Sequence, residues 1–111
     1  MALYQDSVLA SGPLLFISGQ IAQQDDSIPE SIEEQMDVVL GKIDAIIKHN
    51  GVGLSNIVKM SFFITDKEYL PALREKLANY LQGAKPAMTL LIVAGLIDPA
   101  YKVEIEAVVS I

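Results

Sequence analysis

The sequence predicts an α+β fold in which one mixed β-sheet carries two helices on a single face. Two stretches with apolar residues at helical spacing, from Ser31 to Gly51 and from about Lys67 to Gly83, predict the helices. Alternating or continuous apolar segments before, between and after them predict the strands. The expected order is β-β-α-β-α-β-β within one domain of residues 1–111, because a chain of this length builds one core.

The first twenty residues contain two short apolar stretches, Tyr4–Ala10 and Leu14–Ser18. The residues Ser11-Gly12-Pro13 lie between them, and such a combination is typical of a tight turn. We therefore expect a β-hairpin at the start of the chain.

The first helix is predicted to begin at Ser31, because Ser31 and Glu34 have the spacing of a capping box. Gly51 suits the left-handed conformation that ends a helix. Between them lies an apolar stripe at helical spacing: Met36, Val39, Leu40, Ile43, Ile46 and Ile47. The second helix should begin near Lys67 or Glu68, which places Pro71 in the first turn, where backbone N–H groups have no partner within the helix.

Three further strands are predicted after the first helix. Asn56–Ile64 alternates between apolar and more polar residues. Met88–Ala94 is almost wholly apolar, as expected of a strand that is covered on both faces. Tyr101–Val109 again alternates, with Val103, Ile105, Ala107 and Val109 on one face and Lys102, Glu104, Glu106 and Val108 on the other.

One face of this sheet has no element of the chain to cover it. Phe63, Leu91 and Val93 share strands with core-facing neighbours and are expected to point to that open face. It would then expose a sizeable apolar patch, so we expect an oligomer that buries it.

Composition excludes several classes of protein. The formal charge is −6, with 8 Lys and Arg against 14 Asp and Glu, which is the wrong sign for binding a phosphate backbone. The apolar content of 51% excludes a disordered chain, and no apolar run reaches the roughly 18 residues of a membrane span. The absence of cysteine excludes disulfides and thiolate chemistry. We expect no nucleic-acid partner and, from a start without signal-peptide features, a cytoplasmic location.

The chain has one histidine and one arginine. His49 lies in what we expect to be the last turn of a helix, where a cation is favoured by the helix dipole, so it is not interpreted as a catalytic base. A zinc site would have to be completed by carboxylates alone, and no metal is expected. Arg74 lies on the second helix and is interpreted as a solvated surface charge.

Glu104 is the first candidate for a functional side chain. A carboxylate that is enclosed at a subunit boundary is partly desolvated, and it then suits proton transfer or the orientation of water near neutral pH. The alternative is that Glu104 pairs with Lys102 or with a backbone donor. Ser18 and Gly19 are further candidates, because a glycine beside a hydroxyl lets a ligand approach the backbone closely, although a strand-end turn explains them equally well.

Five segments together resemble the RidA/YjgF family over nearly the whole chain: LLFISGQIA at 14–22, SIEEQMDVVLGKIDAII at 31–47, NIVKMSFFITD at 56–66, KPAMTLLIVAGL at 85–96 and VEIEAV at 103–108. The resemblance implies a fold like that of the trimeric chorismate mutases. It also implies a homotrimer with three clefts at its subunit boundaries, in which several members hydrolyse enamines and imines to ketones and ammonia without a cofactor.

The resemblance implies that the cleft contains Tyr4, Ser18, Met88, Thr89 and Glu104. Met88 stands where the family has an arginine that would hold a substrate carboxylate by two parallel hydrogen bonds. Lys85 and Lys102 are the only nearby cations by sequence, and a lysine is a point charge rather than a planar fork. Met88 would instead favour a smaller, more apolar ligand, or it simply fills a strand position at the boundary.

Two functions of different classes follow from these residues. In the first, Glu104 holds the water that attacks a C=N carbon, while Thr89 and Ser18 position a small imine or related metabolite. In the second, the protein is a non-catalytic member that keeps the trimer and the cleft for ligand sensing, protein interaction or chaperone-like binding, which Met88 favours. Ribonuclease activity, a label that this family sometimes carries, has little support from an acidic chain with one histidine.

Overall fold

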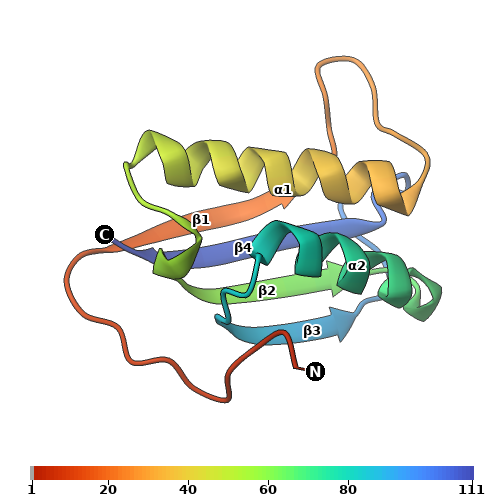
Figure 1. The fold of residues 1–111 in the computed structure, drawn as a ribbon. Coiled ribbons are helices and arrows are strands. Elements are labelled where there is room, and N and C mark those ends of the chain that lie inside the picture. The colour runs from red at the N-terminus through yellow and green to blue at the C-terminus, as the bar shows by residue number, and fades with distance from the viewer. Residues whose placement is uncertain (1) are drawn as a thin grey trace.

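The computed structural model describes residues 2–111 and consists of a four-stranded sheet with two helices against one face (Figure 1). The elements are β1 (Leu14–Ile21), α1 (Ile32–His49), β2 (Ile57–Ile64), α2 (Leu70–Leu81), β3 (Ala87–Ile92) and β4 (Val103–Ser110). Single 3-10 turns precede β2 and α2, at Leu54–Asn56 and Lys67–Tyr69. The predicted α+β class, with both helices on one face, is confirmed.

The strands lie in the order β1-β4-β2-β3, which places the C-terminal strand inside the sheet. β4 runs antiparallel to both β1 and β2, whereas β2 and β3 are parallel, so the sheet is mixed. A parallel pair needs a crossover connection, and α2 supplies it. β1 and β3 are the two edge strands.

The predicted N-terminal hairpin is wrong. β1 pairs with β4, and residues 4–10 form no strand; their one ladder contact is a bridge from Gln5 to Ala87 beside β3. The Gln5 backbone N–H donates to the Pro86 carbonyl at 3.2 Å, and its side-chain Nε2 donates to the Lys85 carbonyl at 2.6 Å. β4 has an apolar stripe along its whole length. β1 pairs with it through apolar residues, whereas the residues directly after Tyr4 are polar, so the N-terminal segment lies along the opposite edge of the sheet (Figure 1).

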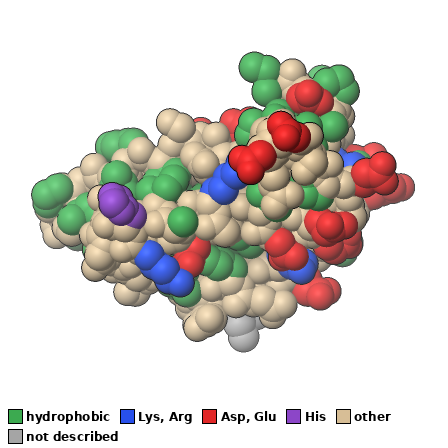
Figure 2. Space-filling model, turned by 90° about the horizontal axis from the view of Figure 1, so that it is seen from above, with side chains coloured by type: hydrophobic (Ala, Val, Ile, Leu, Met, Phe, Trp, Pro, Cys, Tyr) green, Lys and Arg blue, Asp and Glu red, His purple; other side chains and the backbone are tan. Residues whose placement is uncertain are grey.

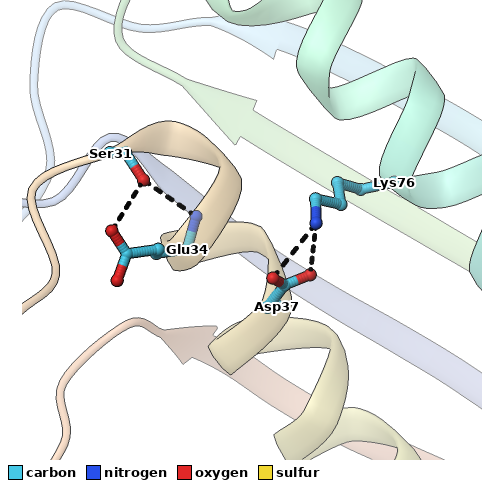
Figure 3. A network of polar contacts seen from close by, with 4 residues as sticks. All are labelled: Ser31, Glu34, Asp37 and Lys76. Carbon is cyan, nitrogen blue, oxygen red and sulfur yellow. Dashed lines mark hydrogen bonds and ion pairs between the residues drawn. The ribbon is translucent and has the colours of Figure 1, made fainter.

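Both ends of α1 have the local chemistry that the sequence predicts. Ser31 is the N-cap: its hydroxyl oxygen accepts a hydrogen bond from the Glu34 N–H and donates one to the Glu34 carboxylate, both at 3.1 Å (Figure 3). The glutamate therefore reaches the serine hydroxyl rather than the serine N–H of the usual capping box. Gly51 has a φ of +74°, the left-handed conformation expected after the helix.

The core fills the space between the sheet and the two helices. It contains the predicted stripe of α1, Leu73, Leu77 and Leu81 of α2, and the inward residues of β2 and β4. A register shift lies between Ile57 and Lys59 of β2, and Ile57 is buried whereas Val58 is half-buried. In β4 the predicted alternation is confirmed, because Val103, Ile105, Ala107 and Val109 are buried.

The helix layer is acidic at the end where both helices begin. Figure 2, which looks onto this layer, shows carboxylate side chains gathered toward the right of the view, and the first turn of α1 contains Glu33 and Glu34. Carboxylates stabilise helix N-termini, where unpaired N–H groups carry partial positive charge. Lys76 of α2 joins the layer by contacting the Asp37 carboxylate oxygens at 3.0 and 3.1 Å (Figure 3).

The opposite face of the sheet is open and partly apolar. Phe16 is 73% exposed and Leu91 is 48% exposed. Phe63 is half-buried, and its strand partners are Leu91 on β3 and Glu104 on β4. The predicted coverage of β3 on both faces is wrong for the single chain, because β3 is an edge strand and its last four residues are exposed. Val93, expected on the open face, lies beyond the end of β3 and is half-buried.

Within residues 2–111, neither helix combines the length and the apolar character that crossing a bilayer requires. The cytoplasmic location stays a prediction.

Candidate functional site

A β-bulge in β1 lies opposite Glu106 in the middle of β4. Ile17 pairs with Ala107 and Gln20 pairs with Ile105, so β1 advances three residues where β4 advances two. The bulge therefore contains Ser18 and Gly19, and bulges of this kind re-aim side chains at functional positions. The Gln20 side chain holds the bulge by donating to the Ser18 carbonyl at 3.0 Å.

The bulge brings the Gly19 backbone directly under the Glu104 carboxylate. A Cβ atom added to Gly19 would lie 2.0 Å from Oε2 of Glu104 and 2.8 Å from its carboxyl carbon. Only glycine leaves room for the carboxylate in this position. The sequence predicted that Gly19 allows close approach to the backbone, and the group that approaches is the protein's own Glu104.

Glu104 is half-buried and lies between the backbones of its strand partners Ile21 and Phe63. Within residues 2–111 its carboxylate has no ion-pair partner. The alternative pairing with Lys102 is wrong for the single chain, because the Lys102 ammonium donates to the Glu30 carbonyl and lies 5.6 Å from the centre of the Tyr69 ring. The Glu104 carboxylate thus lies against the Gly19 backbone and, among the described residues, makes no ion pair.

Thr89 lies on the same open face as Glu104 but two strands away. Its hydroxyl accepts a hydrogen bond of 2.7 Å from the Lys59 ammonium, and its strand partner is Ser61. Two strand spacings separate β3 from β4, which is roughly 9–10 Å. Thr89 therefore does not reach Glu104 within one chain.

Tyr4 and Met88 lie on the other side of the sheet. Met88 pairs with the fully buried Met60 and packs against the core, so it faces the helices. It lines a groove of about 570 Å³ between α2, β3 and the N-terminal segment, and Tyr4 lines the same groove. The structure thus brings together Gly19 and Glu104 on the open face, and Tyr4 and Met88 on the helix face, but it does not unite the two pairs within one chain.

The sequence did not predict that Arg74 lies beside Met88. Arg74 is exposed, as predicted, but it also lines the groove with Tyr4 and Met88. Neither Lys85 nor Lys102, the cations that sequence proximity favoured, lines this groove. The sequence did contain one indication. Arg74 directly follows Leu73, which belongs to the apolar stripe of α2 that faces the sheet, so Arg74 lies at the border of that stripe.

A second groove, of about 650 Å³, lies between α1 and α2 and is explained by helix packing. The Tyr80 hydroxyl donates to the Asp44 carboxylate at 3.1 Å, and Lys48 contacts the same carboxylate at 2.7 Å. Burial and then the nearby Asp44 charge raise the pKa of Tyr80, so it remains a donor at neutral pH. His49 is exposed in the last turn of α1, and residues 2–111 contain no cluster of three metal-ligating side chains.

The closeness of Gly19 and Glu104 makes Gly19→Ala a sharp test of this geometry. We expect the added methyl group to displace the Glu104 carboxylate, because the two cannot occupy the same space. A crystal structure of Gly19→Ala should show a changed Glu104 rotamer. Gly95→Ala is the matched control, because a Cβ at Gly95 meets nothing within 4 Å. An unmoved carboxylate in Gly19→Ala would contradict the described contact.

Comparison with known proteins places these features in a family. The family model described as Endoribonuclease L-PSP matches residues 1–111. The chain is 30% identical to the mitochondrial protein mmf2 of Schizosaccharomyces pombe, over 95% of this chain and 86% of that protein. It is 31% identical to TdcF of Escherichia coli, which is named as a reactive intermediate deaminase, over 87% and 78%.

Solved structures agree with the fold. A Thermotoga maritima protein described as an endoribonuclease superposes with a TM-score of 0.80 at 29% identity, covering 99% of this chain and 87% of that one. A yeast structure superposes with a TM-score of 0.80 at 26% identity, covering 90% and 81%. The match over the whole chain, together with the five sequence segments on which the resemblance rested, establishes that this chain belongs to the RidA/YjgF family.

Proposed function

We propose that this protein hydrolyses small enamines and imines to ketones and ammonia. The observation that carries the proposal is the Glu104 carboxylate, which is half-buried, held over Gly19 and without an ion-pair partner in residues 2–111. A carboxylate in this state can take a proton from water and return it. The likeness to TdcF, named as a reactive intermediate deaminase, supports the same reaction class.

The reaction needs water as its only co-reactant. An enamine enters as its imine tautomer, which forms when one proton leaves the nitrogen, one proton is added to the β-carbon, and the C=C bond becomes the C=N bond. Glu104 takes one proton from water while the water oxygen bonds to the C=N carbon, and the π electron pair of that bond moves to nitrogen. The protonated Glu104 then gives its proton to nitrogen. When the C–N bond breaks, the hydroxyl proton of the intermediate leaves by way of Glu104 to the departing nitrogen, so the products are a ketone and ammonia.

We propose that two copies of the chain form each site. Glu104 and the groove that contains Tyr4 and Met88 lie on opposite faces of one sheet, so one chain cannot direct both at the same small ligand. The exposed apolar residues of the open face, such as Phe16 and Leu91, give neighbouring copies a surface to bury. A homotrimer that packs through this face lets Glu104 of one copy approach the groove of the next.

The direct experiment generates 2-aminoacrylate from serine with a serine dehydratase and measures release of ammonia and pyruvate. Purified protein is expected to accelerate this release above the rate in buffer. Light scattering on the same sample should give about three times the 12.0 kDa chain mass, roughly 36 kDa. A release rate equal to that in buffer would refute the hydrolase, and a stable 12.0 kDa species would refute the shared site.

A second candidate, ligand binding without catalysis, is favoured by Met88. This residue supplies no charge to the groove at the strand position where the resemblance implies an arginine. The same sample distinguishes the two functions. Saturable binding of a 2-oxo acid without faster ammonia release would support the binding protein, whereas turnover supports the hydrolase.

A further inference from the structure

The groove beside Met88 has a cation that comes from a helix rather than from the strand. Arg74 and Leu77 of α2 line this groove, and they lie three residues apart, on neighbouring positions of one helix face. Leu77 is 2% exposed and attaches that face to the sheet. The Arg74 side chain therefore lies at the groove with its base fixed by a well-packed helix.

The N-terminal segment makes up another wall of the groove. The two hydrogen bonds from Gln5 to the carbonyls of Lys85 and Pro86 hold this segment along the start of β3. Tyr4, the residue before it, consequently lines the groove with its phenol. The remaining lining includes Met88 and Leu90, which are apolar.

Arg74 is free to bind an anion. The two ion pairs formed within residues 2–111 are Lys48–Asp44 and Lys76–Asp37, and neither involves Arg74. A guanidinium group offers a planar pair of donors that match both oxygens of a carboxylate. In a chain of net charge −6, an arginine outside these ion pairs and beside an apolar groove gives an anion a local attraction.

We propose that Arg74 binds the carboxylate of the substrate, a task that the uncharged Met88 cannot perform. This inference rests on the proposed function. The cation comes from α2, while Met88 and Leu90 of β3 keep the strand side of the groove apolar.

The test measures binding, so it does not depend on turnover. Isothermal titration of the purified assembly with 2-oxobutanoate compares the natural protein with Arg74→Gln and Arg74→Lys. Lys85→Gln is the matched control, because it removes one positive charge near the start of β3 from a side chain that does not line the groove. 2-Oxobutanamide, which lacks the charge, is the control ligand.

Arg74→Gln is expected to weaken 2-oxobutanoate binding by about tenfold or more, as the loss of a charge-assisted hydrogen bond does. Arg74→Lys should retain part of the affinity, and Lys85→Gln should bind like the natural protein. Binding of 2-oxobutanamide should not respond to Arg74→Gln. Equal affinity of Arg74→Gln and the natural protein, or an equal loss in Lys85→Gln, would overturn the inference, as would a natural protein that does not bind 2-oxobutanoate.

The outcomes for the reaction and for Arg74 are separable. Arg74-dependent binding without any acceleration of ammonia release would support the inference and refute the hydrolase. Acceleration with the same KM in Arg74→Gln and the natural protein would support the hydrolase and overturn the role of Arg74. Because Arg74 is exposed, its replacement removes no core contact, and an unchanged melting temperature confirms that the variants are folded.

Discussion

Replacing Glu104 with glutamine is expected to lower kcat for imine hydrolysis by about a hundredfold to ten-thousandfold, the range found when a positioned acid–base group is removed. Glutamine has nearly the shape of glutamate, so it can keep the position over Gly19 that the carboxylate occupies. It cannot, however, take a proton from water. KM should change little, since Glu104 acts on the water in the proposed mechanism.

Glu106→Gln is the matched control for this prediction. Glu106 lies two residues along β4 on the same face, is exposed and pairs with Ser61, so its replacement makes the same change of charge in the same strand. We expect its kcat to stay close to that of the natural protein. An equal fall in both variants would show that the charge of the open face matters rather than Glu104, and full activity in Glu104→Gln would remove Glu104 from the mechanism.

Replacing Gln35 with leucine is expected to lower the free energy of unfolding by about 3 kcal/mol, roughly 1 kcal/mol for each hydrogen bond that is lost. Gln35 is fully buried in α1. Its side-chain Nε2 donates to the carbonyls of Pro29 and Ala100, and its Oε1 accepts from the N–H of Lys102, each at 2.8 Å. Leucine fills the volume but leaves these three backbone groups without their partner.

Urea denaturation measures the effect, with Gln24→Leu as the control because Gln24 is exposed and its side chain makes no hydrogen bond within residues 2–111. The control should change the free energy of unfolding by less than about 0.5 kcal/mol. A loss below about 1 kcal/mol in Gln35→Leu would mean that water replaces the amide, against the expectation from its burial.

Gln35 also connects stability to the candidate site. It joins the loop before α1 to the chain just before β4, and Glu104 follows Lys102 by two residues. No pattern in the sequence indicated this residue, because a glutamine within an amphipathic helix is ordinarily placed on the solvated face. Only the loops packed over α1 show that its amide is enclosed.

Local patterns were sufficient for both helices, for the last four of the five predicted strands and for the family. The apolar stripe of α1, the cap at Ser31, the stop at Gly51 and the alternation of β4 each depend on neighbours a few residues away, so the sequence determined them correctly. It also determined that one sheet face is open and that Glu104 points there. The order of five motifs sufficed to recognise the family.

Tertiary structure alone decided how distant segments meet. The apolar residues within 4–10 predicted a strand, yet only Gln5 makes a bridge, to Ala87 of β3, while β1 pairs with β4, because strand pairing is settled by long-range contacts. Periodicity predicts which residues share one face of a helix or strand, but it does not predict which other element packs against that face. For this reason the opposite placement of Glu104 and Met88, and the presence of Arg74 beside Met88, emerged only when the strands and α2 were packed together.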